Sequence, residues 1–282
     1  MSHALLSAAL NALGSVPLEA FTPTLLSTSP KAQVWRLVNS ECDWVLKCTL
    51  DPANEDRQAW DNQAWIHAQA ADAHIAPPLI HYQPGHPAIL MAHIDAPDWS
   101  ERINDPALDP ELAQTLKILH ALPTAAHPGS APLDWVETIQ SYLHHPNVAS
   151  HPLAATLLDN LKPWLPKRSA RAPVLVHHDP HAKNWLADQR PLLIDWEYAG
   201  LNDPLFDLVA TARYHDWPVG RCEAWLQSYG FAGDWEEFLR LSLWFDAIHW
   251  LWCIQFDRFE TMPPPFEAKI LRRLSSASLH FE

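Results

Sequence analysis

Apolar positions recur with a helical period at the start of this chain and with a strand-like period after it. Residues 2–13 carry apolar side chains three and four positions apart, which predicts a helix. Short runs rich in Val and Trp follow at 34–38 and 44–48, and both are typical of β-strands. The polar stretch 39–43 between these runs predicts a hairpin turn.

The next part of the chain predicts one helix followed by two strands. Residues 54–73 are rich in Ala, Gln and Trp, are polar on one side, and end before a Pro-Pro pair. Strand-like runs then occur at 79–82 and 88–91, around a Pro-Gly turn. We therefore expect residues 20–91 to form a small antiparallel sheet with one inserted helix.

The remainder of the chain is mostly helical in pattern. Leucines repeat at helical spacing over 111–122, and long helices are expected after residue 204. Further helices are expected at 133–144, 150–162 and 235–258, and short strands at 174–176 and 192–194. A β-rich small lobe is thus followed by a larger helical lobe, joined near residues 92–97, and a cleft between lobes is a common place for a small-molecule site.

Composition and charge narrow the classes of function. The chain has 33 acidic and 19 basic residues and a net charge of −14, which disfavours binding to a nucleic-acid backbone. From residue 188 to the end we count 15 acidic and 8 basic residues, so half of the net charge lies in this third of the chain and favours cationic ligands. Glycine is scarce, with 7 residues, whereas tryptophan is abundant, with 15.

The cysteines, the apolar runs and the N-terminus indicate the cellular compartment in which the protein is expected. The 4 cysteines form no C-x-x-C pair and are expected to be buried thiols in a reducing cytoplasm. No apolar run approaches the roughly 18 residues needed to span a bilayer. The N-terminus has no basic region ahead of a long apolar stretch, so we expect no signal peptide and a cytoplasmic protein without a membrane segment.

The candidate chemistry is concentrated in residues 174–200. This stretch reads V-L-V-H-H-D-P-H-A-K-N-W-L-A-D-Q-R-P-L-L-I-D-W-E-Y-A-G. One strand leads into a polar loop with Asp179 and Asn184, and a second leads to Asp195 and Glu197. Carboxylate and amide oxygens suit Mg²⁺, which also binds phosphates, and a neighbouring carboxylate can accept a proton from a hydroxyl. The arrangement predicts phosphoryl transfer.

H-x-D-x-x-x-x-N followed by an apolar strand and I-D-W-E resembles the aminoglycoside phosphotransferase / choline kinase / thiamine kinase family. Four other stretches match family segments in order: V-L-K at 45–47, L-M-A-H at 90–93, L-H-A-L-P at 119–123 and D-P-L-F-D-L at 203–208. The resemblance covers nearly the whole chain and implies an α+β, protein-kinase-like fold with two lobes. It implies a nucleotide-binding lobe at 1–94, with the small sheet, and a helical lobe at 95–282 with the catalytic loop and acceptor site.

The resemblance also implies roles for residues of the polar loops. Asp179 would be the catalytic base or orient the acceptor hydroxyl, and Asn184 and Asp195 would hold Mg²⁺. Glu197 would face a second metal ion or the substrate. His177 belongs to the same catalytic set, where it braces the loop rather than reacts.

The nucleotide site follows from the same resemblance. Lys47 would neutralise the phosphates of ATP, and Met91 and His93 would lie in the hinge that receives adenine. The family's phosphate loop falls at residues 26–34, which contain no glycine, so the hydroxyl of Ser29 and its neighbours would replace backbone donors.

A second departure concerns the acidic helix residue that pairs with the lysine in this family. Gln63 lies at or near its place, and Asp61 or Glu55 could substitute if the alignment slips by a few residues. A neutral partner would hold the lysine less firmly.

The helical lobe supplies the acceptor site in this family. Residues 235–259 are dense in aromatic and acidic side chains, a composition that suits a cation through cation–π contacts. Trp250 and Trp252 are the aromatic candidates for acceptor binding. Asp207 either contacts the substrate or fixes the catalytic loop.

These observations favour an ATP- and Mg²⁺-dependent kinase that phosphorylates a hydroxyl of a small cationic metabolite, with choline and thiamine first and ethanolamine next. An aminoglycoside or amino-sugar phosphotransferase is an alternative. A non-catalytic nucleotide-binding protein on the same scaffold is another, motivated by the missing glycines and Gln63. A protein kinase is disfavoured because the chain has no D-F-G or A-P-E segment.

Overall fold

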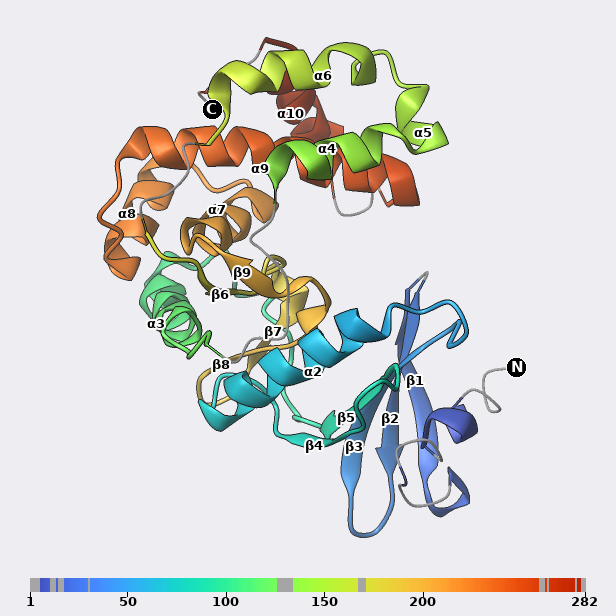
Figure 1. Cartoon of the computed structure of the whole chain (residues 1–282). Coiled ribbons are helices and arrows are strands. Elements are labelled where there is room, and N and C mark those ends of the chain that lie inside the picture. Colours follow the sequence, from blue (N-terminus) through green and yellow to red (C-terminus); the bar gives the residue numbers. More distant parts are fainter. Residues whose placement is uncertain are drawn as a thin grey trace.

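The computed structural model describes residues 6–10, 14, 18–29, 31–125, 134–166, 171–258, 262, 264–276 and 278–279. Figure 1 shows that these residues form two lobes, a small one built on a β-sheet and a larger one built mainly of helices. The expected mixed fold, with an antiparallel sheet ahead of a helical part, is confirmed. The lobe boundary between residues 94 and 95 stays a prediction.

The small lobe is a five-stranded antiparallel sheet with the order β1-β2-β3-β5-β4. Its elements are β1 (Thr22–Thr28), β2 (Ala32–Val38), β3 (Asp43–Thr49), α2 (Arg57–Asp72), β4 (Leu79–Tyr82) and β5 (Ala88–Ala92), preceded by the short 3-10 helix η1 (Leu18–Ala20). Strand β1 extends the expected sheet by one edge strand that its sequence, T-P-T-L-L-S-T, did not reveal. Residues 6–10 are helical as expected, and residues 2–5 and 11–13 of that expected helix lie outside the described residues.

Short polar residues close the tight turns of this sheet. The side chain of Asn39 accepts the backbone N–H groups of Glu41 and Cys42 at 2.8 and 2.7 Å, so the expected β2–β3 hairpin turn is confirmed. An Arg36–Asp43 ion pair with two parallel hydrogen bonds, at 2.8 and 2.6 Å, joins the same strands beside the turn. These contacts fix the register that carries Lys47 on β3 opposite Val34.

Helix α2 connects the two lobes. Asp56 caps its N-terminus by accepting the N–H groups of the first turn. Trp60 and Ala64 pack toward the sheet, whereas Ile66 and Ala70 belong to the core of the large lobe. In Figure 1 the helix lies between the sheet and the short strands of the large lobe. Because α2 packs on both sides, a side chain on it can reach the junction between the lobes.

The large lobe contains helices around two pairs of short strands. Its elements are η2 (Pro106–Leu108), α3 (Asp109–His120), α4 (Trp135–Leu143), α5 (Pro146–Ala149), α6 (Ala154–Leu161), η3 (Lys162–Trp164), β6 (Val174–Val176), η4 (Ala182–Asn184), β7 (Trp185–Ala187), β8 (Pro191–Leu193), η5 (Trp196–Tyr198), β9 (Gly200–Asn202), α7 (Leu205–Tyr214), α8 (Val219–Tyr229), α9 (Trp235–Phe256) and α10 (Pro264–Ser276). The two expected strands do not pair with each other, because β6 pairs with β9 and β7 pairs with β8. Residue 133 of one expected helix lies outside the described residues.

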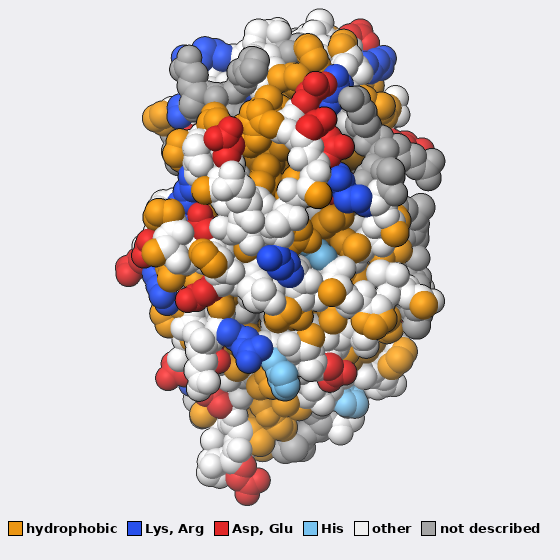
Figure 2. Space-filling view, turned by 90° about the vertical axis from the view of Figure 1, so that its left-hand side faces the viewer, with side chains coloured by type: hydrophobic (Ala, Val, Ile, Leu, Met, Phe, Trp, Pro, Cys, Tyr) orange, Lys and Arg blue, Asp and Glu red, His pale blue; other side chains and the backbone are white. Residues whose placement is uncertain are grey.

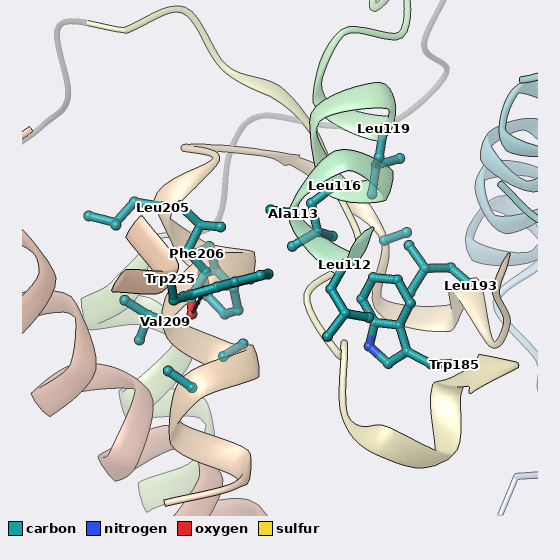
Figure 3. Packing of buried hydrophobic residues seen from close by; sticks show 14 of the residues in the cluster. Leu112, Ala113, Leu116, Leu119, Trp185, Leu193, Leu205, Phe206, Val209 and Trp225 are labelled. Carbon is teal, nitrogen blue, oxygen red and sulfur yellow. Dashed lines mark hydrogen bonds between the residues drawn. The ribbon is translucent and has the colours of Figure 1, made fainter. Parts of the chain in front are cut away.

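One apolar core holds the β7–β8 hairpin between helices. Figure 3 shows Leu112, Leu116 and Leu119 of α3 facing Trp185 and Leu193 of the β7–β8 hairpin, with side chains of α7 and α8 packed nearby. This leucine spacing is the one from which the sequence predicted the helix at 111–122. Burial of several complete Leu and Trp side chains, each worth about 1.5–3 kcal/mol, makes the segment a rigid platform.

The surface carries charges of both signs. On the face that includes α3 and α8, acidic and basic side chains alternate with scattered hydrophobic ones (Figure 2). Within the described residues, no helix is both long and apolar enough to cross a bilayer.

Candidate functional site

The side chain of Lys47 joins the two lobes. Lys47 lies in β3 and is 6% exposed. Its Nζ donates to Asp195 Oδ1 at 2.5 Å and to Glu197 Oε2 at 2.9 Å. Asp195 follows β8 in a left-handed conformation, with φ of 66°, and Glu197 lies in η5. Three residues that the sequence assigned to nucleotide and metal binding are therefore in direct contact.

The charges in this cluster stabilise one another. Burial alone would lower the pKa of Lys47, but the carboxylates of Asp195 and Glu197 outweigh it and raise that pKa. Burial would likewise raise the pKa of Asp195, but the neighbouring ammonium group of Lys47 lowers it. The side chain of Asp195 is 41% exposed, so it remains accessible from solvent.

The helix partner of Lys47 is neutral. Gln63 of α2 is buried and its Oε1 accepts from Lys47 Nζ at 3.3 Å, which agrees with the position expected from the sequence. The two acidic alternatives are wrong. Glu55 accepts from the Thr49 hydroxyl at 2.5 Å, and Asp61 accepts from the Tyr82 hydroxyl and from Gly85 N–H at 2.8 Å.

The carboxylate of Asp179 is held from two sides. Asn184 Nδ2 donates to Asp179 Oδ2 at 3.0 Å and to the Asp179 backbone carbonyl at 2.9 Å. Tyr214, the last residue of α7, donates its hydroxyl to Asp179 Oδ1 at 2.6 Å. His181 Nε2 lies 3.6 Å from Oδ2. The sequence did not single out Tyr214, because no short-range pattern connects it with Asp179.

His177 braces the loop and is not accessible to a substrate. It is fully buried, and its Nε2 faces the carbonyl of Ile194 at 2.9 Å, so this nitrogen carries the proton. Its Nδ1 accepts the N–H of Asp179 at 3.3 Å. Burial lowers the pKa of His177 and keeps the ring neutral. These contacts fit the bracing role and leave neither nitrogen for proton transfer.

Asp207 anchors the backbone of the same loop. Its carboxylate is fully buried and accepts the N–H of His177 at 2.8 Å, the N–H of His178 at 2.9 Å and His120 Nε2 at 3.0 Å. Burial alone would raise the pKa of Asp207, but the hydrogen bond from His120 outweighs it and lowers that pKa. The expectation of substrate contact is wrong for this arrangement, because three donors surround the carboxylate and none of it is exposed.

The residues that the sequence assigned to ATP binding, apart from Lys47, lie at opposite ends of the sheet. Ser29, in the turn between β1 and β2, accepts the N–H of Ala32 at 3.0 Å, so this hydroxyl already closes its own turn. Met91 lies in β5 and His93 directly follows that strand, with its Nδ1 3.2 Å from Asp43 Oδ2. Pro30, inside the glycine-free loop, lies outside the described residues.

The two tryptophans of α9 have different environments. Trp250 is fully buried among α4, α5, α6 and α10, and its ring centroid lies 4.7 Å from that of His151. Its assignment to acceptor binding is therefore wrong for this arrangement. Trp252 is half-buried and lies near the hydroxyl of Tyr198. Helix α9 is apolar on nearly all sides, so its sequence could not tell the two apart.

The charge of Asp179 acts on three tyrosines. The negative charge of Asp179 contributes to raised pKa values of Tyr142, Tyr198 and Tyr214, with burial as the largest cause for each. They come from α4, η5 and α7, elements that are far apart in the sequence. Of the three, Tyr214 donates a hydrogen bond to the carboxylate of Asp179.

The oxygen donors fit a hard cation. Asn184 uses its amide nitrogen on Asp179, which leaves its Oδ1 for a ligand, and Asp195 and Glu197 offer carboxylates. Among the described residues no group of three or more His, Cys, Asp and Glu is arranged to hold a metal ion. Mg²⁺ is commonly held by one or two carboxylates together with phosphates and water, so this donor set suits it.

A cavity of about 530 Å³ lies on another side of the catalytic loop. Its lining includes Asp109, His215, Trp217 and Arg221, none of which the sequence singled out. His215 Nε2 accepts the N–H of Ala182 at 3.1 Å, so a residue that lines this cavity also holds the backbone of the loop.

The comparisons with known proteins agree with this geometry. The model of a family described as "Phosphotransferase enzyme family" matches residues 31–244. A sequence search of curated proteins found no match.

Solved structures share the fold at low sequence identity. Choline kinase LicA from Streptococcus pneumoniae is 16% identical, with 98% of each chain covered and a TM-score of 0.72, and its structure is also known in complex with AMP. A choline/ethanolamine kinase family protein from Mesorhizobium loti is 20% identical, covering 98% of this chain and 100% of its own, with a TM-score of 0.66. A thermostable mutant of aminoglycoside phosphotransferase APH(4)-Ia is 14% identical, with coverages of 96% and 97% and a TM-score of 0.67.

Proposed function

Because the chain belongs to the phosphotransferase enzyme family, we propose that it transfers the terminal phosphoryl group of ATP to a hydroxyl of a small cationic metabolite. The observation that carries this proposal is the contact of Lys47 with Asp195 and Glu197 across the lobes, beside the loop that holds Asp179. Phosphoryl transfer needs little more than positioned phosphates, a compensating charge and an oriented hydroxyl, and these side chains can supply all three.

Each residue has a distinct part in the proposed reaction. Lys47 exchanges its carboxylate partners for nucleotide phosphates. Asn184 Oδ1, Asp195 and Glu197 would hold Mg²⁺, which when bound neutralises charge on the phosphates. Asp179 orients the acceptor hydroxyl and takes its proton as the phosphoryl group is transferred. Met91 at the end of β5 and His93 directly after that strand would receive the adenine.

Aromatic and acidic groups together favour a cationic acceptor. The charge of Asp179 acts on Tyr142 and Tyr198, that of Glu197 acts on Tyr198, and an aromatic ring face attracts a cation by about 0.5–2 kcal/mol per contact. Such a site suits a compact alkyl- or aryl-ammonium alcohol, of which choline, thiamine and ethanolamine are the first examples. The relatives with solved structures include choline kinases and an aminoglycoside phosphotransferase, so amino sugars and aminoglycosides belong in the same test.

The test is an ADP-release assay with Mg-ATP against choline, thiamine, ethanolamine, amino sugars and several aminoglycosides. We expect one acceptor class to stimulate ADP release strongly. Asp179→Ala should lower that rate by about 10²–10⁴-fold while leaving the melting temperature within a few degrees. A variant that retains most of its activity would refute the role of Asp179.

A non-catalytic nucleotide-binding protein is the second candidate, and the neutral Gln63 beside Lys47 is the observation that favours it. Thermal shifts with ATP, measured with and without Mg²⁺, separate the two candidates. Stabilisation by ATP together with no ADP release from any acceptor would support the binding protein and overturn the kinase.

A further inference from the structure

The Tyr214 hydroxyl lies closer to the Asp179 carboxylate than Asn184 or His181 does. Its oxygen lies 2.6 Å from Asp179 Oδ1, and Asn184 Nδ2 occupies the other carboxylate oxygen at 3.0 Å. A hydrogen bond from an O–H group to a carboxylate at this distance is among the stronger ones in proteins. Two donors from different elements, α7 and the catalytic loop, therefore fix both oxygens of the same carboxylate.

One helix supports both the loop and the carboxylate. Asp207 lies in the first turn of α7 and Tyr214 is its last residue, seven positions later, so both project from the same face of the helix. Asp207 accepts the backbone N–H groups of His177 and His178, whereas Tyr214 donates to the side chain two residues beyond His177. The helix thus sets the position of the loop and the orientation of Asp179 together.

Packing prevents the Tyr214 ring from swinging away. Phe245 and His249 of α9 contact it edge-on, with ring centroids 5.0 and 4.9 Å away, and His181 lies 5.5 Å away. Burial raises the pKa of Tyr214 well above its ordinary value, with Asp179 adding to the effect, so the hydroxyl keeps its proton and remains a donor.

We propose that Tyr214 is a positioning residue, whose hydroxyl holds the carboxylate of Asp179 in the single orientation that receives the acceptor hydroxyl. This inference rests on the proposed function, because it assigns Asp179 the part of the base. With one lone pair on each oxygen already occupied, the carboxylate can rotate only by breaking a hydrogen bond. The remaining lone pairs define the direction from which an acceptor can approach.

The experiment compares steady-state ADP release from Mg-ATP with choline, followed by the other acceptors of the panel, in four proteins. These are the wild type, Tyr214→Phe, Asp179→Ala and the double variant. Tyr214→Phe keeps the ring and its packing and removes only the hydroxyl. We expect kcat to fall about 10- to 100-fold, because small misplacement of a catalytic group has costs of this size. The KM for ATP should stay within twofold, since Tyr214 has no part in nucleotide binding.

The matched control is Tyr82→Phe. Its hydroxyl also donates to an aspartate, Asp61, but between β4 and α2 in the small lobe. We expect this variant to change kcat by less than twofold. A loss that follows from removing any tyrosine hydroxyl that donates to an aspartate would be the same in both variants.

The double variant tests whether Tyr214 acts through Asp179. In the Asp179→Ala background the further change Tyr214→Phe should have no effect on kcat, because the group it positions is already absent. An equal loss in both backgrounds would overturn the proposal, as would an unchanged kcat in Tyr214→Phe. If the wild type and Asp179→Ala release ADP equally with every acceptor, the proposed function fails first and this proposal with it.

Discussion

Replacing Asp207 by Asn distinguishes an anchor of the catalytic loop from a substrate ligand. The buried carboxylate accepts two bonds on Oδ2, from His177 N–H and His120 Nε2, and one on Oδ1, from His178 N–H. Asn has the same shape but only one acceptor oxygen. In its best orientation it keeps the two bonds on the Oδ2 side and turns an NH₂ group toward the N–H of His178.

The expected loss of stability follows from these three contacts. Hydrogen bonds to a charged group contribute about 1.5–3 kcal/mol each and neutral ones about 0.5–1.5 kcal/mol, so each of the two retained bonds weakens by about 1 kcal/mol. The third bond is lost and leaves two donors facing each other, which costs about 1–3 kcal/mol more. The total of about 3–5 kcal/mol is a large fraction of the 5–15 kcal/mol typical of a folded domain.

Urea unfolding followed by tryptophan fluorescence measures this loss, and Asp216→Asn is the matched control. Asp216 lies just beyond the same helix, pairs with Lys269 at 2.8 Å, and both side chains are partly exposed, so its replacement should cost less than about 1 kcal/mol. A substrate ligand behaves differently: Asp207→Asn would then raise the KM for the acceptor and leave the unfolding midpoint unchanged. A loss of stability below 1 kcal/mol would refute the anchoring role.

Three further predictions concern the core and the nucleotide side. Asp246→Ala, which leaves two buried guanidinium groups of α7 and α10 without their shared carboxylate, should cost about 3–5 kcal/mol in urea unfolding. Burial lowers the pKa of His67 and of His249 from 6.5 to about 4, so the unfolded state takes up protons first as the pH falls. Stability is complete above pH 6.5 and should fall by about 2 kcal/mol per histidine at pH 5; His67→Gln, which keeps a donor for the backbone, should reduce that slope. Gln63→Glu gives Lys47 a third anionic partner and should change the Kd for ATP by at least threefold in calorimetry, whereas an unchanged Kd would contradict the contact.

Local sequence patterns were sufficient to predict most secondary-structure elements of the small lobe and several candidate site residues. The periods of apolar residues predicted the β2–β3 hairpin, the α2 and α3 helices and the change from a sheet to helices, because each depends on side chains only a few positions apart. The spacing H-x-D-x-x-x-x-N followed by I-D-W-E identified four candidate site residues, because the members of each motif are only a few positions apart. They are Asp179, Asn184, Asp195 and Glu197. Strand β1 was missed because an exposed edge strand buries no regular set of side chains.

Only the tertiary structure decided which residues meet across long separations. Lys47 and Asp195 are 148 positions apart, and Asp179 and Tyr214 are 35 positions apart, so no short pattern could pair them. Trp250 lies in the core while its neighbour Trp252 is half-buried, because the surroundings of α9, and not its own apolar sequence, determine which side is covered. The sequence by itself determined the chemical groups and their local elements. Packing of α7 and α9 against the loop around Asp179 determined which of these groups face its carboxylate, because that choice depends on contacts between segments distant along the chain.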